Sequence, residues 1–168
     1  MTIIVNWVEQ QNQMDRCIEI PFFDETLLIY YFNNVITKTE WRLGPDDCLS
    51  LDDDKDWHQL QQYLTKPIEN LTVNLKKQGS DFRHKVWEEM CKIPVGQTLT
   101  YSALARKIDS GARAVANACR DNPFPGIIPC HRVVSVSGLG GYMGQTDGRC
   151  LEIKGNILAG EAGKFNFG

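Results

Sequence analysis

The sequence lacks any hydrophobic run long enough to cross a membrane and any opening segment typical of a secretory signal. Its longest apolar stretches, such as LLIYYF at residues 27–32, fall far short of the roughly 20 residues that a membrane helix needs. The opening MTIIVNWVEQ has neither a positively charged start nor a small-residue cleavage site. We therefore expect a cytoplasmic protein without membrane association. A composition of 42% hydrophobic and 23% charged residues is typical of a globular chain with one large or two small domains.

The sequence also lacks the motifs of common metal and phosphate sites. Its six cysteines are scattered, with no CxxC or HxxxH pair, and thiols in the cytoplasm stay reduced. The only metal-binding combination worth naming is Cys17, Cys48 and His58, and we expect no metal. The glycine-rich segment 136–148 has neither the GxGxxG spacing nor a GK[ST] ending, so it does not predict a phosphate-binding loop.

Charge is distributed unevenly along the chain. Residues 1–75 hold 5 Lys and Arg against 13 Asp and Glu, whereas residues 76–168 hold 13 against 8. A basic half favours a polyanionic partner such as nucleic acid, although many solvated surfaces reach the same balance.

The first 75 residues are typical of a small strand-rich domain. The Asn-Asn pair at 33–34 suits a hairpin turn, and helical spacing of apolar residues predicts one helix at 57–64. Segments rich in β-branched and aromatic residues predict strands at 2–8, 17–23, 26–32, 35–41 and 68–75.

The remainder of the chain reads as mostly helical after a polar joint at 76–80. Ser80 is a good N-cap for a helix over 81–91, with Phe82, Val86, Trp87 and Met90 expected in the core. Segments 100–108 and 112–122, separated by a break at 109–111, have the outline of a helix-turn-helix. Segment 121–134 is too rich in proline for helix, and 149–163 has partly helical spacing. We predict an α+β fold with domains at 1–75 and 80–168.

The second helix of the pair carries mostly small side chains. Alanine occupies positions 112, 114, 116 and 118, and Arg113 and Arg120 supply its charge. Two interpretations remain open: a closely packed interior helix, or a helix that lies against a wide partner with an arginine projecting into it.

The hexapeptide PCHRVV at 129–134 places Cys130 beside His131 and Arg132. A thiol attacks as its thiolate, and a neighbouring base or positive charge favours that form. Adjacent residues on a strand face opposite ways, so cooperation between Cys130 and His131 needs a turn or an intervening water. From the dipeptide alone, a structural cysteine is the commoner interpretation.

A wider set of motifs resembles the O6-alkylguanine-DNA alkyltransferases, the methylated-DNA–protein-cysteine methyltransferases. The resemblance covers residues 80–163 and rests on three stretches besides the hexapeptide itself: SDFRHKVWEEMCKIPVGQTLTYSALA, ARAVANACRDNPFPGIIPCHRVV and GLGGYMG. It implies stoichiometric, irreversible transfer of an alkyl group from guanine O6 in duplex DNA to a cysteine, without a cofactor. The implied partner is duplex DNA carrying O6-alkylguanine, with O4-alkylthymine as a second candidate lesion, bound by a monomer.

The same resemblance assigns catalytic roles. It implies that Cys130 is the alkyl acceptor and that His131 activates it through a water. Glu161 matches the glutamate that orients the histidine, with Glu152 as its rival. Asn122 matches a hinge asparagine between the helix-turn-helix and the active-site loop.

DNA-binding roles follow in the same way. Arg113 resembles the arginine that replaces the extruded nucleotide, Tyr101 the tyrosine that rotates the phosphate, and Tyr142 a wall of the base pocket. Met143 stands where many relatives carry a serine that hydrogen-bonds O6. The remaining residues expected near the DNA or the base are Val133, Lys154, Arg120, Ala112 and Ala114.

Two other functions compete with this one. A helix-turn-helix protein could bind lesions and mark them without transferring the alkyl group. A cysteine hydrolase acting on acyl groups would use a base-paired thiol without a DNA-binding element. The intact Cys130, His131 and Asn122, together with the two-helix segment, favour the alkyltransferase.

Overall fold

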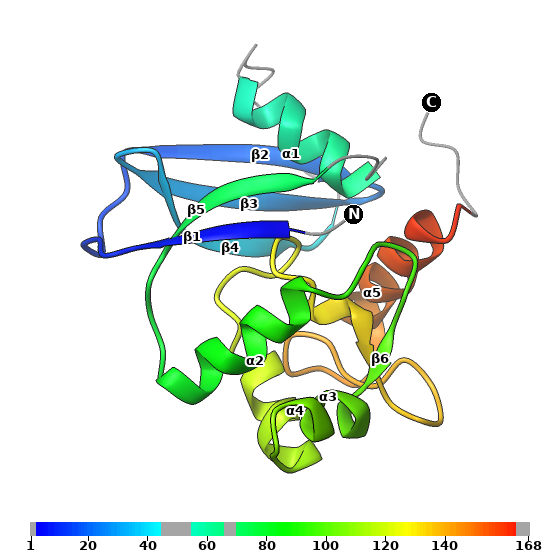
Figure 1. The fold of residues 1–168 in the computed structure, drawn as a ribbon. Coiled ribbons are helices and arrows are strands. Elements are labelled where there is room, and N and C mark those ends of the chain that lie inside the picture. The colour runs from blue at the N-terminus through cyan, green and yellow to red at the C-terminus, as the bar shows by residue number, and fades with distance from the viewer. Residues whose placement is uncertain (1–2, 45–54, 66–69, 164–168) are drawn as a thin grey trace.

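The computed structural model describes residues 3–44, 55–65 and 70–163, which form a mixed fold of one sheet and a group of helices (Figure 1). The sheet has the strand order β1-β5-β4-β3-β2. β1 pairs in parallel with β5 and β5 with β4, whereas β4, β3 and β2 pair antiparallel as a meander. The strands span Ile3–Val8 (β1), Arg16–Phe22 (β2), Glu25–Phe32 (β3), Val35–Arg42 (β4) and Leu71–Lys76 (β5).

All five predicted strands are present, with ends shifted by a few residues; positions 2, 68 and 69 lie outside the described residues. β3 lies inside the sheet, and its first five residues are all buried because both of its faces are covered. Asn33 and Asn34 have φ of 49° and 61°, as a tight two-residue hairpin between β3 and β4 requires. The predicted helix is α1, Lys55–Thr65, which buries Leu60, Tyr63 and Leu64 and lies over the sheet in Figure 1.

The joint at 76–80 leads into α2, Asp81–Cys91, whose limits match the prediction. Ser80 is its N-cap, and the hydroxyl accepts a hydrogen bond from the Arg83 amide. Val86, Trp87 and Met90 are buried, as expected. Phe82 is not, with 37% of its surface exposed. Its position in the first turn of α2 places it beyond the edge of the core, so including it in the buried stripe was wrong.

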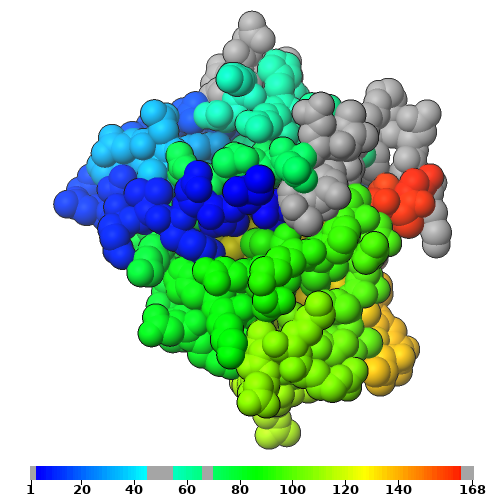
Figure 2. All heavy atoms as spheres, viewed as in Figure 1, coloured from blue at the N-terminus to red at the C-terminus, as the bar shows by residue number. Residues whose placement is uncertain are grey.

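The helix-turn-helix is present as α3, Tyr101–Lys107, and α4, Ala112–Arg120. Asp109 in the connecting turn has a positive φ of 55°, which aspartate tolerates better than most residues. The Lys85 ammonium of α2 donates to the Ile108 carbonyl at 2.9 Å and fastens this turn. The pair forms the end of the molecule farthest from the sheet (Figures 1 and 2).

Four further elements carry or surround the cysteine. Cys130–Arg132 form a single 3-10 turn, and α5 spans Gly148–Glu161. The prediction that residues 121–134 are not helical holds for α-helix, since none lies there, but Cys130–Arg132 form the 3-10 turn. The sequence did not predict the two-residue strands β6, Leu99–Thr100, and β7, Val133–Val134, which pair in parallel.

The sheet and the helical part are in direct contact. Trp7 of β1 packs edge-on against His84 of α2, with ring centroids 4.4 Å apart, and Figure 2 shows β1 lying against the surface of α2. Within the described residues no helix has the length and apolar character needed to cross a membrane. That part of the chain also holds no group of three or more His, Cys, Asp or Glu placed to bind a metal; Cys48 lies outside it.

Candidate active site

The Cys130 thiol lines a cavity of about 280 Å³ between α4 and the glycine-rich loop. Only 5% of the Cys130 surface is exposed, so a reagent reaches the thiol through this cavity. Tyr101 at the start of α3 lines it as well. The other lining residues come from α4 (Ala116, Asn117, Cys119, Arg120) and from the loop (Gly141, Tyr142, Met143, Gly144, Gln145, Thr146).

Asn122 holds the segment that delivers the cysteine. Its side-chain amide donates to the Ile128 carbonyl at 3.1 Å, and its side-chain oxygen accepts from the Phe124 amide at 2.9 Å. The amide of Asn122 also interacts with the Cys130 thiol, where it favours the thiolate. Asn122 therefore ties the end of α4 to the segment that leads to the cysteine.

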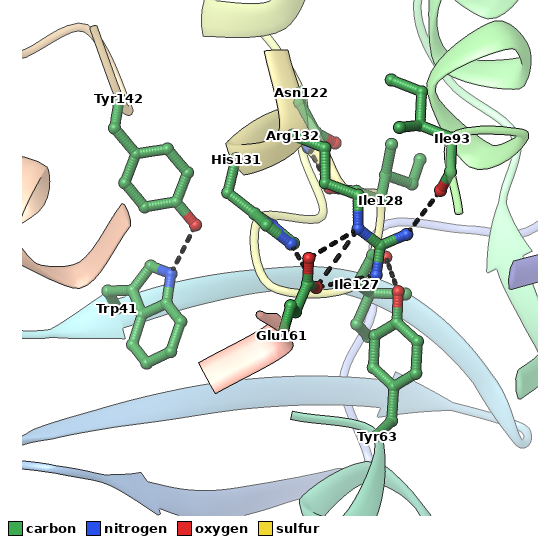
Figure 3. A network of polar contacts seen from close by, with 10 residues as sticks. All are labelled: Trp41, Tyr63, Ile93, Asn122, Ile127, Ile128, His131, Arg132, Tyr142 and Glu161. Atoms are coloured by element: carbon green, nitrogen blue, oxygen red, sulfur yellow. Dashed lines mark hydrogen bonds and ion pairs between the residues drawn. The ribbon is translucent and has the colours of Figure 1, made fainter. Parts of the chain in front are cut away.

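His131, next to the cysteine in the chain, forms a buried pair with Glu161 (Figure 3). His131 Nε2 lies 2.8 Å from Glu161 Oε1. The Arg132 guanidinium donates to the same carboxylate, with Nη2 2.7 Å from Oε1 and Nε 3.0 Å from Oε2, and its Nη1 donates to the Ile93 carbonyl at 2.8 Å. Glu152, the alternative partner for the histidine, lies exposed elsewhere on α5.

The charges of this group follow from its burial and contacts. Burial alone would raise the pKa of Glu161, but His131 and the Arg132 guanidinium outweigh it and lower the pKa to about 2. Burial lowers the pKa of His131 against the opposing pull of Glu161. The imidazole is therefore neutral at neutral pH, with its Nε2–H donating to the carboxylate. Its Nδ1 is buried with no hydrogen-bond partner among the described residues, which leaves it free to accept a proton.

The thiol itself is not ionised by its surroundings alone. Burial raises the pKa of Cys130, while Asn122 and Lys154 act against that rise. Arg132 was considered as the cation beside the thiol, but its guanidinium engages Glu161 and Ile93 instead. The nearby cation is Lys154, fully buried, whose ammonium donates to the Val133 carbonyl at 2.7 Å and the Gly141 carbonyl at 2.8 Å. Burial lowers the Lys154 pKa to about 8.

Two tyrosines border the cavity on different sides. The Tyr101 hydroxyl donates to the Gly141 carbonyl at 3.4 Å. Tyr142 is 3% exposed, and its oxygen accepts from the indole N–H of Trp41 at 3.0 Å (Figure 3). Met143 follows with a positive φ of 53°, so a tight turn presents this apolar side chain to the cavity, where a serine was the family expectation.

The outer face of α4 carries Arg113, Asn117 and Arg120, all exposed and one helical turn apart. Ala112 and Ala114 are partly buried between them. Because Asn117 and Arg120 also line the cavity, this face runs from the cavity mouth to Arg113. Val133 is completely buried, and its carbonyl accepts the hydrogen bond from the Lys154 ammonium.

Three residues of this site were missed or misplaced by sequence reasoning. The sequence indicates Arg132 only as a neighbour of the cysteine; a buried carboxylate requires an opposite charge, but nothing in the sequence selects Arg132 to supply it. Trp41 and Tyr63 belong to the amino-terminal part, where no chemical motif marks them. Tyr63 donates to the Ile127 carbonyl at 3.2 Å, and nothing local in its sequence signals that contact.

Known proteins resemble this chain over the same region. The sequence model of the family described as 6-O-methylguanine DNA methyltransferase, DNA binding domain, matches residues 81–163. A Methanosarcina mazei methylated-DNA–protein-cysteine methyltransferase is 39% identical over 93 residues, covering 54% of this chain and 59% of that protein. The inducible Bacillus subtilis enzyme of the same name is 41% identical over 113 residues, 62% of this chain and 63% of its own. The matches thus span about three fifths of these relatives.

Solved structures extend the likeness to the amino-terminal sheet. A Mycobacterium tuberculosis OGT crystallised in complex with DNA has a TM-score of 0.69 at 29% identity, covering 87% of this chain and 92% of that one. The M. tuberculosis O6-methylguanine methyltransferase has a TM-score of 0.68 at 27% identity, over 90% and 95% of the two chains. With the family model on the helical half and this fold over nearly the whole length, the chain belongs to the O6-methylguanine-DNA methyltransferase family.

Proposed function

We propose that this protein repairs duplex DNA by transferring an alkyl group from O6 of guanine to Cys130, once per molecule. The observation that carries the proposal is a buried thiol at the wall of a cavity bounded by α4 of a helix-turn-helix. An acyl-transferring cysteine hydrolase would not need that helix beside its thiol. The match to the methyltransferase family also favours repair.

The proposed step is a displacement at the alkyl carbon. His131 Nδ1 accepts the thiol proton, directly or through a water, while Glu161 holds the ring from Nε2. A bond forms between Sγ and the alkyl carbon as the bond from that carbon to O6 breaks. The electron pair passes to the guanine, which takes up a proton to become ordinary guanine. The thioether is stable, so each protein molecule acts once and needs no cofactor.

The lesion has to leave the base stack to reach this thiol. Flipping a nucleotide costs a few kcal/mol, and an inserted side chain offsets part of that cost. Arg113 is exposed at the start of α4, which supports the proposal that it fills the vacated stack. The neighbouring alanines let the helix approach the minor groove closely, and phosphate contacts would bind DNA without regard to sequence. O4-alkylthymine is a second candidate substrate for the same cavity, to be tested in the same transfer assay.

The proposal extends to the organisation of the chain. Residues 80–168 form the alkyltransferase and DNA-binding domain, and residues 1–75 form a support domain that contacts the loop before the cysteine. We expect the protein to act as a monomer, which light scattering with and without DNA would test. A reduced thiol is required, as is usual in the cytoplasm.

The deciding experiment is intact-protein mass spectrometry after mixing with a duplex that carries one O6-methylguanine. We expect the mass to rise by one methyl group, mapped to Cys130 and absent in C130S. Tight binding of the lesion without a mass change would instead favour a lesion-marking protein. If the protein neither binds the lesion nor takes up a methyl group, the repair function is refuted.

A further inference from the structure

The wall of the cavity opposite α4 is held by a residue from the amino-terminal sheet. Trp41, near the end of β4, is 6% exposed and donates its indole N–H to the phenol oxygen of Tyr142 at 3.0 Å (Figure 3). The two residues are 101 positions apart in the chain. This contact therefore links the sheet to the side chain that borders the reacting base.

Trp41 itself has little freedom to move. Its ring packs against Phe22, with centroids 5.8 Å apart. A side chain added at Gly126 would come within 3.4 Å of the Trp41 ring and 2.8 Å of Leu27, so the loop before the cysteine is in close contact with the sheet here. Thr39, two residues earlier on β4, donates its hydroxyl to the Pro125 carbonyl at 2.6 Å. The indole is thus fixed from its own sheet and from the loop.

The direction of the hydrogen bond matters for the chemistry. An indole nitrogen only donates, so the Tyr142 oxygen must accept from Trp41. The phenol proton is then directed away from the Trp41 nitrogen. Both groups are almost fully buried, where an unmade hydrogen bond is costly and a made one fixes geometry.

We propose that Trp41 is a positioning residue for alkyl transfer: its N–H fixes the Tyr142 ring as a wall of the base pocket, so the amino-terminal domain sets the reactivity of Cys130. This inference rests on the proposed function. It assigns to residues 1–75 an effect on the reaction rate that goes beyond stabilising the fold.

The test is a double-mutant cycle with W41F, Y142F and the double variant. W41F keeps an aromatic ring but removes the donor. The measured quantities are the maximal rate and the half-saturating concentration for methyl transfer from a duplex with one O6-methylguanine. We expect W41F to lower the maximal rate about tenfold, as loss of one buried hydrogen bond would, without changing affinity for undamaged DNA. In the Y142F background, W41F should have no further effect.

W57F is the matched control. The Trp57 indole also donates from the amino-terminal part, to the Glu19 carbonyl at 2.8 Å, but it does not reach the cavity. W57F should transfer at the wild-type rate, so a slow W41F could not be attributed merely to losing an indole donor in the amino-terminal part.

The contact can also be observed without activity. In a ¹H–¹⁵N spectrum, Y142F should shift the Trp41 indole signal and speed its exchange with solvent, leaving that of Trp57 unchanged. A wild-type rate for W41F, or equal losses in the wild-type and Y142F backgrounds, would overturn the proposal. An unshifted indole signal would overturn it as well. If the wild-type protein transfers no methyl group, the proposed function fails, and the indole signal alone reports whether the contact exists.

Discussion

The buried carboxylate of Glu161 should be the most consequential charge in this protein for stability. Its pKa is lowered from 4.5 to about 2, and each pKa unit corresponds to about 1.4 kcal/mol. The ionised form therefore contributes about 3 kcal/mol to folding. Removing one member of a buried ion pair costs about 3–5 kcal/mol in other proteins, which agrees, since E161Q would leave the Arg132 guanidinium without its counter-charge.

The pH dependence has a definite sign. A carboxylate whose pKa is depressed by folding stabilises the protein fully above its unfolded-state pKa, and this contribution is lost as the pH falls toward the folded-state pKa. We therefore expect E161Q to lower the free energy of unfolding by about 3 kcal/mol at pH 7. The gap between wild type and E161Q should close as the pH falls from about 4.5 toward about 2.

Urea unfolding at a series of pH values measures that gap. E152Q is the matched control, because Glu152 lies exposed on the same helix and surface substitutions change stability by about 0.5 kcal/mol or less. The reasoning would be refuted if E161Q lost no more stability than E152Q at pH 7. A gap that stayed constant on acidification would refute the assigned charge.

Three other outcomes follow from the site. R113A should slow transfer from duplex DNA about a hundredfold, because a few kcal/mol of flipping is no longer offset, while transfer from free O6-benzylguanine stays unchanged; an equal loss with the free base would exclude the inserted-arginine role. N122A should cost about 2 kcal/mol of stability in urea unfolding, since it removes two buried hydrogen bonds, and should slow transfer from both substrates; an effect as small as that of a surface substitution would argue against the hinge. Burial lowers the pKa of His131 below 6.5, so the imidazole should remain a neutral base at pH 6.5. The transfer rate, measured as a function of pH, should therefore decline with a midpoint below 6.5. A midpoint at or above 6.5 would contradict a neutral buried base.

Local sequence chemistry was enough to predict most of the elements. The limits of α2 follow from an N-cap at Ser80 and from the break after Cys91, and the turn between β3 and β4 follows from two asparagines. These signals act within a few residues, so they can be read from a single chain. Phe82 marks the limit of this approach, because a helical stripe gives the direction of a side chain but not where the core ends.

Contacts between distant segments could not be read in this way. The pairing of Leu99 with Val133 joins strands of two residues each, too short to give a periodic signal. The family resemblance placed His131 and Glu161 in one site, but it gave no account of Arg132, which supplies the opposite charge that a buried carboxylate requires. Only the fold brings its guanidinium to that carboxylate.

The site is therefore assembled from two parts of the chain with different tasks. The buried pair of His131 and Glu161, which we propose accepts the thiol proton, lies wholly within the helical half. The wall of the pocket depends on the sheet, because the oxygen of Tyr142 accepts from Trp41 and the loop before Cys130 is bonded to Thr39. A change in how the two halves pack would leave the acidity of the thiol nearly untouched, while displacing the base whose alkyl carbon the thiol attacks in the proposed reaction. Variants at the contact between the halves should accordingly alter the rate of transfer without altering its dependence on pH, whereas variants at His131 or Glu161 should alter both.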